Sequence, residues 1–161
     1  MAHPLGKITG AAAIAAGLLV GLEGYEAKPY LDSAGVLTDC YGNTKNVSRQ
    51  IIRTKAECQE LLQGEAGRIA TFIARDDQAH SQRISMNALA AMISWTYNVG
   101  DGAYRQSTAR KYMLAGNYEA MCREMYRWNK ITVAGVKITL PGLNNRRAVE
   151  VALCLKPDGT P

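Results

Sequence analysis

The stretch of this chain that decides its fold is residues 23–44, EGYEAKPYLDSAGVLTDCYGNT. It holds a glutamate, an aspartate and a threonine, Glu23, Asp32 and Thr38, within sixteen residues. Turn-forming residues alternate here with aromatic and branched ones, and Asp32-Ser33-Ala34-Gly35 is typical of a turn between two extended runs. We therefore expect a small hairpin or three-stranded ribbon over residues 27–43. Because such a ribbon is marginal alone, it must pack on other structure.

A long helix is predicted after the ribbon. Thr54-Lys55-Ala56-Glu57 has the form of a capping box, with Thr54 as the N-cap and Glu57 reaching back to its backbone amide. One apolar face continues to Ile73, and the charged run over residues 74–83 is expected to end the helix. This helix is a candidate connector between two lobes.

The remaining chain is predicted to be mainly helical. The expected helices are Ile84–Val99, central to the core and stopped by Gly100 and Gly102; Ser107–Ala115, closed by Gly116; Asn117–Trp128, with Asn117 as N-cap; and Leu143–Leu155, after a break at Pro141-Gly142.

Composition narrows the class of protein. The chain has 161 residues, of which 47% are hydrophobic and 20% charged, as in an ordinary globular domain. A net charge of +5 favours polyanions, which include nucleic acid, acidic lipid and the anionic bacterial cell wall. The basic residues show no recognition-helix pattern, so we expect no nucleic-acid partner.

The chain has four cysteines, and their spacing bears on metal binding. No CxxC pair is present, so we expect no zinc site and no other metal centre. Two disulfides or four buried thiols remain possible, and the compartment decides between them.

Residues 1–22 allow three interpretations. Residues 8–22 carry no charge and are rich in Ala and Gly. This run is shorter than the roughly 20 apolar residues that a membrane-spanning helix needs. The segment could be a core helix, because Ile14, Leu18, Leu19 and Leu22 fall at helical spacing. It could be a weak membrane anchor that later leaves the bilayer, or a cleaved signal peptide, although cleavage near Gly21 would leave Glu23 at a ragged end.

The acidic residues of the opening stretch suit hydrolysis of a glycosidic bond. That reaction needs one group to protonate the leaving oxygen and a second to activate water or stabilise the transition state. Glu23, partly screened by the preceding helix, is expected to favour its protonated form, whereas Asp32 on a polar turn stays ionised. Thr38 could hold a water through its hydroxyl. By spacing alone, the three residues could equally be ordinary helix-end, turn and strand residues.

The same stretch resembles the signature of phage-type lysozymes, glycoside hydrolase family 24. The positions that match are Glu23, Gly24, Tyr30, Asp32, Gly35, Thr38, Gly42 and Thr44. The resemblance continues through SWTYNVGDGAYRQST (94–108), Arg127-Trp128 and PGLNNRRAVE (141–150), and so spans most of the chain.

The resemblance implies an endolysin that hydrolyses the β-1,4 bond between N-acetylmuramic acid and N-acetylglucosamine in peptidoglycan, without a cofactor and as a monomer. Glu23 would be the general acid, Asp32 the second carboxylate and Thr38 the residue that helps to hold the attacking water, with inversion at the anomeric carbon. The implied fold is α+β and lysozyme-like, with residues 23–161 as the catalytic domain and a cleft between a small ribbon lobe and a larger helical lobe.

Three further site expectations come from the resemblance. An arginine of the last helix approaches the catalytic glutamate in the family; Arg146 or Arg147 matches, and we favour Arg147, which we expect to contribute to substrate binding. Ser94 and Asn98, one turn apart, would face the cleft and bind sugar. Where many members have His near the end of the signature, this chain has Asn43.

Some members carry a weakly hydrophobic signal-anchor that is exported and then released, and residues 1–22 look like one. We therefore expect a phage-encoded protein that is transiently held in the host inner membrane, inactive there, and released into the periplasm. Export favours disulfides, and of the three possible connectivities we expect the locally shorter closures, which are Cys40 with Cys58 and Cys122 with Cys154.

Two alternatives compete with hydrolysis. A lytic transglycosylase would cleave the same bond without water and needs only the acid, so the presence of Asp32 and Thr38 argues against it. A cationic membrane-active protein would need no chemistry, and lysis would then survive the change Glu23→Gln.

Overall fold

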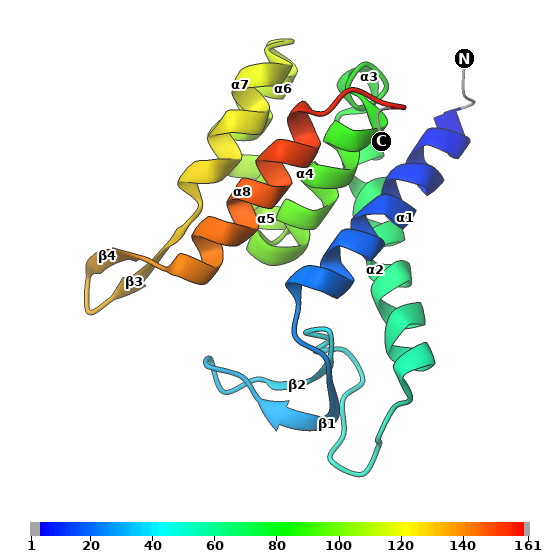
Figure 1. Cartoon of the computed structure of the whole chain (residues 1–161), viewed down its shortest axis with the longest axis vertical. Helices are drawn as coiled ribbons and strands as arrows, with labels where there is room; N and C mark the ends of the chain where they lie inside the picture. Colours follow the sequence, from blue (N-terminus) through cyan, green and yellow to red (C-terminus); the bar gives the residue numbers. More distant parts are fainter. Residues whose placement is uncertain (1–3, 160–161) are drawn as a thin grey trace.

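A computed structural model describes residues 4–159, and the chain forms a small β-ribbon lobe and a larger helical lobe joined by a long helix (Figure 1). The elements are α1 (Pro4–Leu22), β1 (Glu26–Leu31), β2 (Leu37–Cys40), α2 (Lys55–Asp76), α3 (Gln78–Ser81), α4 (Met86–Val99), α5 (Asp101–Gln106), α6 (Thr108–Leu114), α7 (Tyr118–Glu124), the 3-10 helix η1 (Met125–Arg127), β3 (Lys130–Val133), β4 (Val136–Thr139) and α8 (Pro141–Leu155). This is the mainly helical α+β lysozyme-like architecture expected from the sequence.

The small lobe is an antiparallel hairpin. β1 pairs with β2 so that Tyr30 lies opposite Thr38, and the connecting turn begins at Asp32. Gly35 in that turn has φ 77°, a conformation that glycine adopts without steric cost. A disulfide between Cys40 and Cys58 fastens the end of β2 to the first turn of α2. The covalent link anchors a ribbon that would be marginal alone.

The connector helix α2 starts as predicted. The Thr54 hydroxyl accepts a hydrogen bond from the Glu57 amide (3.2 Å), and the Glu57 carboxylate accepts one from the Thr54 amide (2.6 Å). The capping box is therefore confirmed. The helix ends at Asp76, inside the charged run, but that run also forms the short helix α3, which was not predicted.

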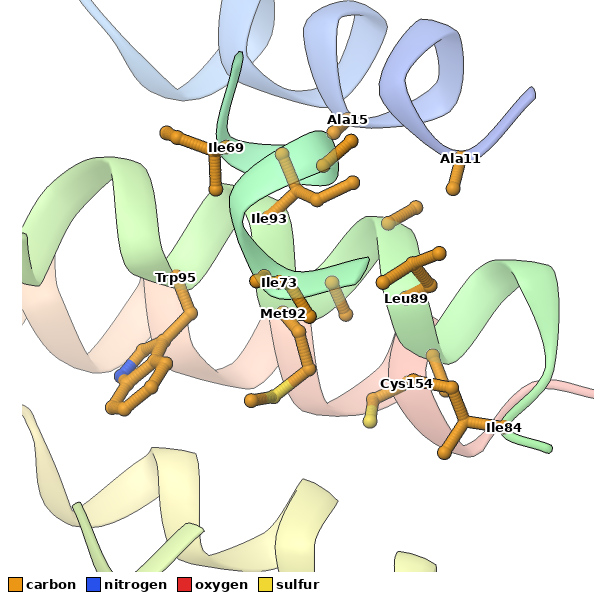
Figure 2. Close-up of a cluster of buried hydrophobic side chains, with 14 of the residues drawn as sticks. Ala11, Ala15, Ile69, Ile73, Ile84, Leu89, Met92, Ile93, Trp95 and Cys154 are labelled. Carbon is orange, nitrogen blue, oxygen red and sulfur yellow. The ribbon is translucent and has the colours of Figure 1, made fainter. Parts of the chain in front are cut away.

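The core of the large lobe surrounds α4, whose residues 88–96 are all buried. α1 packs against both α2 and α4. Figure 2 shows Ala11 and Ala15 directed from α1 towards the cluster that contains Leu89 and Ile93, and all four side chains are fully buried. Small side chains on the inner face of α1 allow the helix backbones to approach closely, as a tight core requires.

The packed arrangement of α1 is one of the three interpretations of residues 1–22, of which the first three lie outside the described residues. Its stretch Leu5–Leu22 is also long and apolar enough to cross a membrane, and only 28% of that stretch is buried. The helix therefore packs in the core along one face and exposes an apolar remainder.

Several predicted helix boundaries in the large lobe are wrong. α4 begins at Met86 rather than Ile84, and the helix predicted to reach Trp128 is α7, which ends at Glu124 and is followed by η1. Gly100, with φ 92°, ends α4 as expected, but Gly102 lies inside the short helix α5. α8 begins at Pro141 rather than Leu143, because the fixed φ of proline suits the first turn of a helix, where its missing N–H is not needed.

Two features of the C-terminal half extend what the sequence suggested. β3 and β4 form a second antiparallel hairpin between η1 and α8 that was not predicted. A disulfide joins Cys122 of α7 to Cys154 of α8, so both cysteine pairs are those expected from the sequence.

Candidate active site

Glu23 lies immediately after α1. Its backbone N–H donates to the Leu19 carbonyl (2.8 Å), which carries the helical hydrogen-bonding pattern one residue further. Its side chain is 22% exposed, and its Oε1 accepts a hydrogen bond from Nη1 of Arg146 in α8 at 2.5 Å. The position of this carboxylate is therefore set by the docking of α1 on one side and of α8 on the other.

Arg146, not Arg147, is the arginine that reaches the glutamate. Its Nε donates to Glu150 (3.2 Å) and its Nη2 donates to the Ser94 carbonyl (3.3 Å), so a single guanidinium joins α4, α8 and Glu23. The expectation for Arg147 was wrong because consecutive helical residues point about 100° apart. Arg146 is the one directed towards the end of α1.

Arg147 lies inside the helical lobe, so the expectation that it contacts substrate is wrong. Its side chain is fully buried and donates to Glu150, to the Asn98 side-chain oxygen and to the Trp128 carbonyl (3.0 Å). Asn98 is an exposed residue, so it remains a candidate for sugar binding.

Ser94 does not face solvent. It is fully buried, and its hydroxyl donates to Glu150 at 2.7 Å. The prediction that Ser94 binds sugar directly is therefore wrong. It was placed on the right helix, but helical spacing alone did not show that its direction leads into the core.

Glu150 is the centre of this network, although no role was predicted for it. Its buried carboxylate accepts from Ser94, Arg146 and Arg147. Burial raises the pKa of the Glu150 carboxyl, while the two guanidinium groups oppose that shift. Burial also lowers the pKa of Arg147. Two carboxylates and two guanidinium groups thus form a charge-balanced cluster that ends at Glu23.

Asp32 builds the turn on which it sits. Its Oδ1 accepts hydrogen bonds from the Ala34 amide (2.9 Å) and the Val36 amide (2.8 Å). Within the described residues, no hydrogen bond or ion pair is made by its other oxygen, Oδ2. The side chain is partly exposed. One carboxylate oxygen therefore shapes the turn, and the second is available for chemistry.

Tyr30 links the three predicted catalytic residues. It pairs with Thr38 across the hairpin, and burial together with the charges of Asp32 and Glu23 raises the pKa of its hydroxyl. The charge of the exposed Glu26 acts in the same direction. Thr38 itself is 3% exposed, and its hydroxyl donates to the Val36 carbonyl (3.0 Å), which leaves its lone pairs as acceptors.

The loop after β2 forms a wall beside Glu23. A methyl group built on Gly42 would lie 4.0 Å from the Glu23 Oε2 and 3.9 Å from the Tyr97 hydroxyl. That hydroxyl donates to the Tyr41 carbonyl at 2.6 Å, and burial followed by the charge of Glu23 raises its pKa. A pocket of about 690 Å³ between this loop and α2 is lined by Gly42 and Tyr97 but not by Glu23, Asp32 or Thr38. The pocket therefore adjoins the acidic site without containing it.

Asn43, at the position where many members of the resembled family have His, keeps a polar contact. Its amide donates to the buried Asp39 carboxylate (2.7 Å) and to the Lys45 carbonyl (3.0 Å), and Asp39 also pairs with Arg53. The loop is thus held without an ion pair to residue 43. Among residues 4–159, no cluster of three or more His, Cys, Asp or Glu side chains is placed to hold a metal ion.

The comparisons with known proteins agree with this geometry. The family model for phage lysozyme matches residues 20–150, well over half of the chain. The chain belongs to the phage lysozyme family. As a phage lysozyme it is a glycoside hydrolase, a muramidase of the endolysin type that degrades peptidoglycan in host lysis.

Individual relatives cover nearly the whole of this lysozyme. A SAR-endolysin of Bacteriophage PS119 is 38% identical over 157 residues, which cover 91% of this chain and 87% of the relative. The structure of an endolysin from Escherichia coli O157:H7 phage FAHEc1 is 32% identical with a TM-score of 0.75, covering 91% and 92% of the two chains. The active form of P1 phage endolysin Lyz is 28% identical with a TM-score of 0.72, covering 88% and 83%.

Sequence reasoning found the acidic residues of this lysozyme but missed those around them. Tyr97 and Glu150 lie inside motifs that were recognised, yet nothing in the sequence assigned them a role. One signal could have drawn attention to Glu150. It follows Arg147 by three residues and Arg146 by four, so all three can meet on a helix, and a buried carboxylate requires such partners.

Proposed function

We propose that this lysozyme acts as a monomer on peptidoglycan and hydrolyses the β-1,4 bond between N-acetylmuramic acid and N-acetylglucosamine, with Glu23 as the general acid. The observation that carries the proposal is the position of the Glu23 carboxylate. It is mostly shielded from water and fixed by Arg146, and its charge and that of Asp32 both raise the pKa of Tyr30. A fixed acid beside a second carboxylate is what glycoside hydrolysis requires.

Asp32 and Thr38 have the complementary roles in this proposal. The Asp32 oxygen that is not used in the turn accepts a proton from water, and the Thr38 hydroxyl accepts a hydrogen bond that orients this water. Attack from the face opposite the leaving group inverts the anomeric carbon. Asn98 is the candidate contact for a sugar hydroxyl or acetamido group.

The test is the rate of turbidity loss of purified cell walls with wild type and with Glu23→Gln. We expect activity to fall by at least about 100-fold, as for the loss of a general acid. Glu26→Gln is the matched control, since Glu26 is exposed on β1 three residues away and should keep near wild-type activity. Anhydromuramic products would indicate a lytic transglycosylase instead, and lysis by Glu23→Gln would indicate a non-enzymatic killing protein.

We further propose that residues 1–22 are exported as an anchor in the host inner membrane and that release into the periplasm lets α1 pack as the first helix. The support is that α1 is apolar enough to enter a bilayer but carries small residues on its packed face. Glu23 directly follows α1, so its carboxylate reaches Arg146 only when α1 is docked. Full peptidoglycan hydrolysis by protein still in the membrane fraction would overturn this proposal.

A further inference from the structure

The β3–β4 hairpin has a two-residue turn. Ala134 has φ 47° and Gly135 has φ 80°, and positive φ at both central residues is characteristic of the type I′ turn, whose twist matches that of the flanking strands. The register is complete from Lys130 opposite Thr139 to Val133 opposite Val136. The turn and register therefore fix which side chains share each face.

The two faces of the hairpin differ in character. One face carries only aliphatic side chains, which are Ile131 (39% exposed), Val133 (47%), Val136 (61%) and Ile138 (44%). The other face carries Lys130, Thr132, Lys137 and Thr139. All eight strand residues are exposed, so the hairpin is an amphipathic ribbon whose aliphatic face is not taken up by the core.

Hydrogen bonds close the base of the hairpin and join it to α8. The Leu140 amide donates to the Asn129 carbonyl (3.0 Å), and the Asn129 side chain donates to Asn144 of α8 (2.6 Å). Figure 1 shows the hairpin projecting from the helical lobe next to the start of α8. The hairpin is thus attached to that lobe through its base.

The exposed charges of the hairpin are positive. Lys130 and Lys137 are exposed, no Asp or Glu occurs from Trp128 to Val149, and the chain as a whole carries +5. An aliphatic face beside a lysine-bearing face is the arrangement that lies in the interface of an anionic bilayer, where the apolar side chains enter the acyl boundary and the lysines reach the headgroups.

We propose that the β3–β4 hairpin is a lipid-binding surface, separate from α1, that holds the folded enzyme on anionic phospholipid bilayers. Other occupants fit the face less well. Aliphatic side chains offer no hydrogen bonds to sugar hydroxyls. Four partly exposed side chains also provide far less than the roughly 800 Å² that each partner buries in a standard protein interface.

The experiment measures co-sedimentation of the purified, folded full-length protein with vesicles of phosphatidylglycerol and phosphatidylethanolamine, and with vesicles of phosphatidylcholine alone. The variant is the double substitution Ile131→Ser and Ile138→Ser. We expect wild type to bind the anionic vesicles and the variant to bind them about tenfold or more weakly, because two apolar contacts are lost. Glu23→Gln should bind like wild type, so the result does not depend on the proposed catalytic role.

Two further variants make the test specific. Thr132→Ser with Thr139→Ser changes the polar face and should bind like wild type. Leu5→Ser with Val20→Ser changes exposed side chains of α1 and should retain most binding. The proposal is wrong if the hairpin variant binds anionic vesicles like wild type, if wild type binds phosphatidylcholine equally well, or if the hairpin variant loses hydrolysis of purified peptidoglycan, since the face would then be a substrate surface.

Discussion

Glu150 holds the two arginines of α8 together although it does not touch Glu23. Its carboxylate is fully buried and accepts hydrogen bonds from three side chains. A buried charge is tolerated only when its partners are in place, and removing one partner leaves the others uncompensated. The geometry at Glu23 therefore depends on a carboxylate on the far side of Arg146.

Glu150→Gln should destabilise the fold by about 3–5 kcal/mol, because Arg147 would keep its charge in a fully buried place without a charged partner. Urea-induced unfolding measures the change. Glu119→Gln is the control, since the pair of Glu119 with Arg123 is exposed and should contribute less than about 1 kcal/mol. Equal effects of the two substitutions would show that the buried network adds nothing.

Arg146→Lys should lower the rate of cell-wall hydrolysis by about tenfold, whereas Arg147→Lys should act mainly on stability. A lysine ammonium cannot bridge Glu23, Glu150 and the Ser94 carbonyl at once, as the guanidinium of Arg146 does. The rates and the unfolding midpoints of both variants separate the two roles. If Arg147→Lys lost hydrolysis rate while its unfolding midpoint stayed at the wild-type value, this assignment would be contradicted.

The site was predictable in its chemistry and only partly in its geometry. Glu23 and Asp32 could be chosen because a turn and a helix end place carboxylates at recognisable positions. The choice between Arg146 and Arg147 failed because both can reach Glu150 on the same helix, and only the distant position of Glu23 distinguishes them. The prediction for Ser94 failed for the same reason. Its burial depends on α8, which is distant in the sequence.

The start of α2 is an element whose stability can be tested by pH. Hydrogen bonds from the Thr54 amide and hydroxyl lower the pKa of Glu57 below its ordinary value of 4.5. Since the folded state favours the ionised form, the contribution to stability is present above that ordinary value and is lost as the pH falls through the lowered one.

The difference in urea midpoint between wild type and Glu57→Ala should therefore stay constant from neutral pH to about 4.5 and close below it. Glu60→Ala, on the same helix but outside the capping box, is the control. Its difference in urea midpoint from wild type should not disappear below pH 4.5 in this way. Thr54→Ala should cost about 1 kcal/mol at neutral pH, as the loss of an N-cap does. A difference that grows as the pH falls would contradict the direction of the shift.

Elements with strong local signals were predicted, and short ones were missed. The capping box of α2 and the N-cap at Asn117 are local, so they could be identified without knowing the fold, whereas Ser107 was predicted as the first helical residue and is the N-cap of α6. β3 and β4 lack a core partner, and their turn is Ala-Gly rather than the stronger Asn-Gly signal, so neither pattern nor turn chemistry marked them. α5 escaped because two glycines flank its first residue.

The docking of α1 links the N-terminal segment to the rest of the protein. Its inner face is made of small residues, so a larger side chain there would separate α1 from α4. Overpacking of this kind costs about 1–3 kcal/mol.

Ala15→Leu should destabilise the folded protein by that amount and increase the fraction retained in membranes, because it adds apolarity and prevents close packing. Ala13→Leu adds the same apolarity on the exposed face of α1 and is the matched control. It should affect membrane retention without the loss of stability. Urea unfolding and membrane fractionation report the two effects, and equal stability of both variants would contradict the packing argument.

The two disulfides have a consequence for how the enzyme tolerates reduction. One disulfide joins β2 to α2 and the other joins α7 to α8, whereas α1 contains no cysteine. Replacing either pair by serines should cost about 3 kcal/mol through the entropy of the unfolded chain. The packing of α1 against α2 and α4, by contrast, depends on non-covalent contacts alone. Thiol reagents should therefore shorten the working life of the enzyme at high temperature while leaving its initial rate in the cold unchanged.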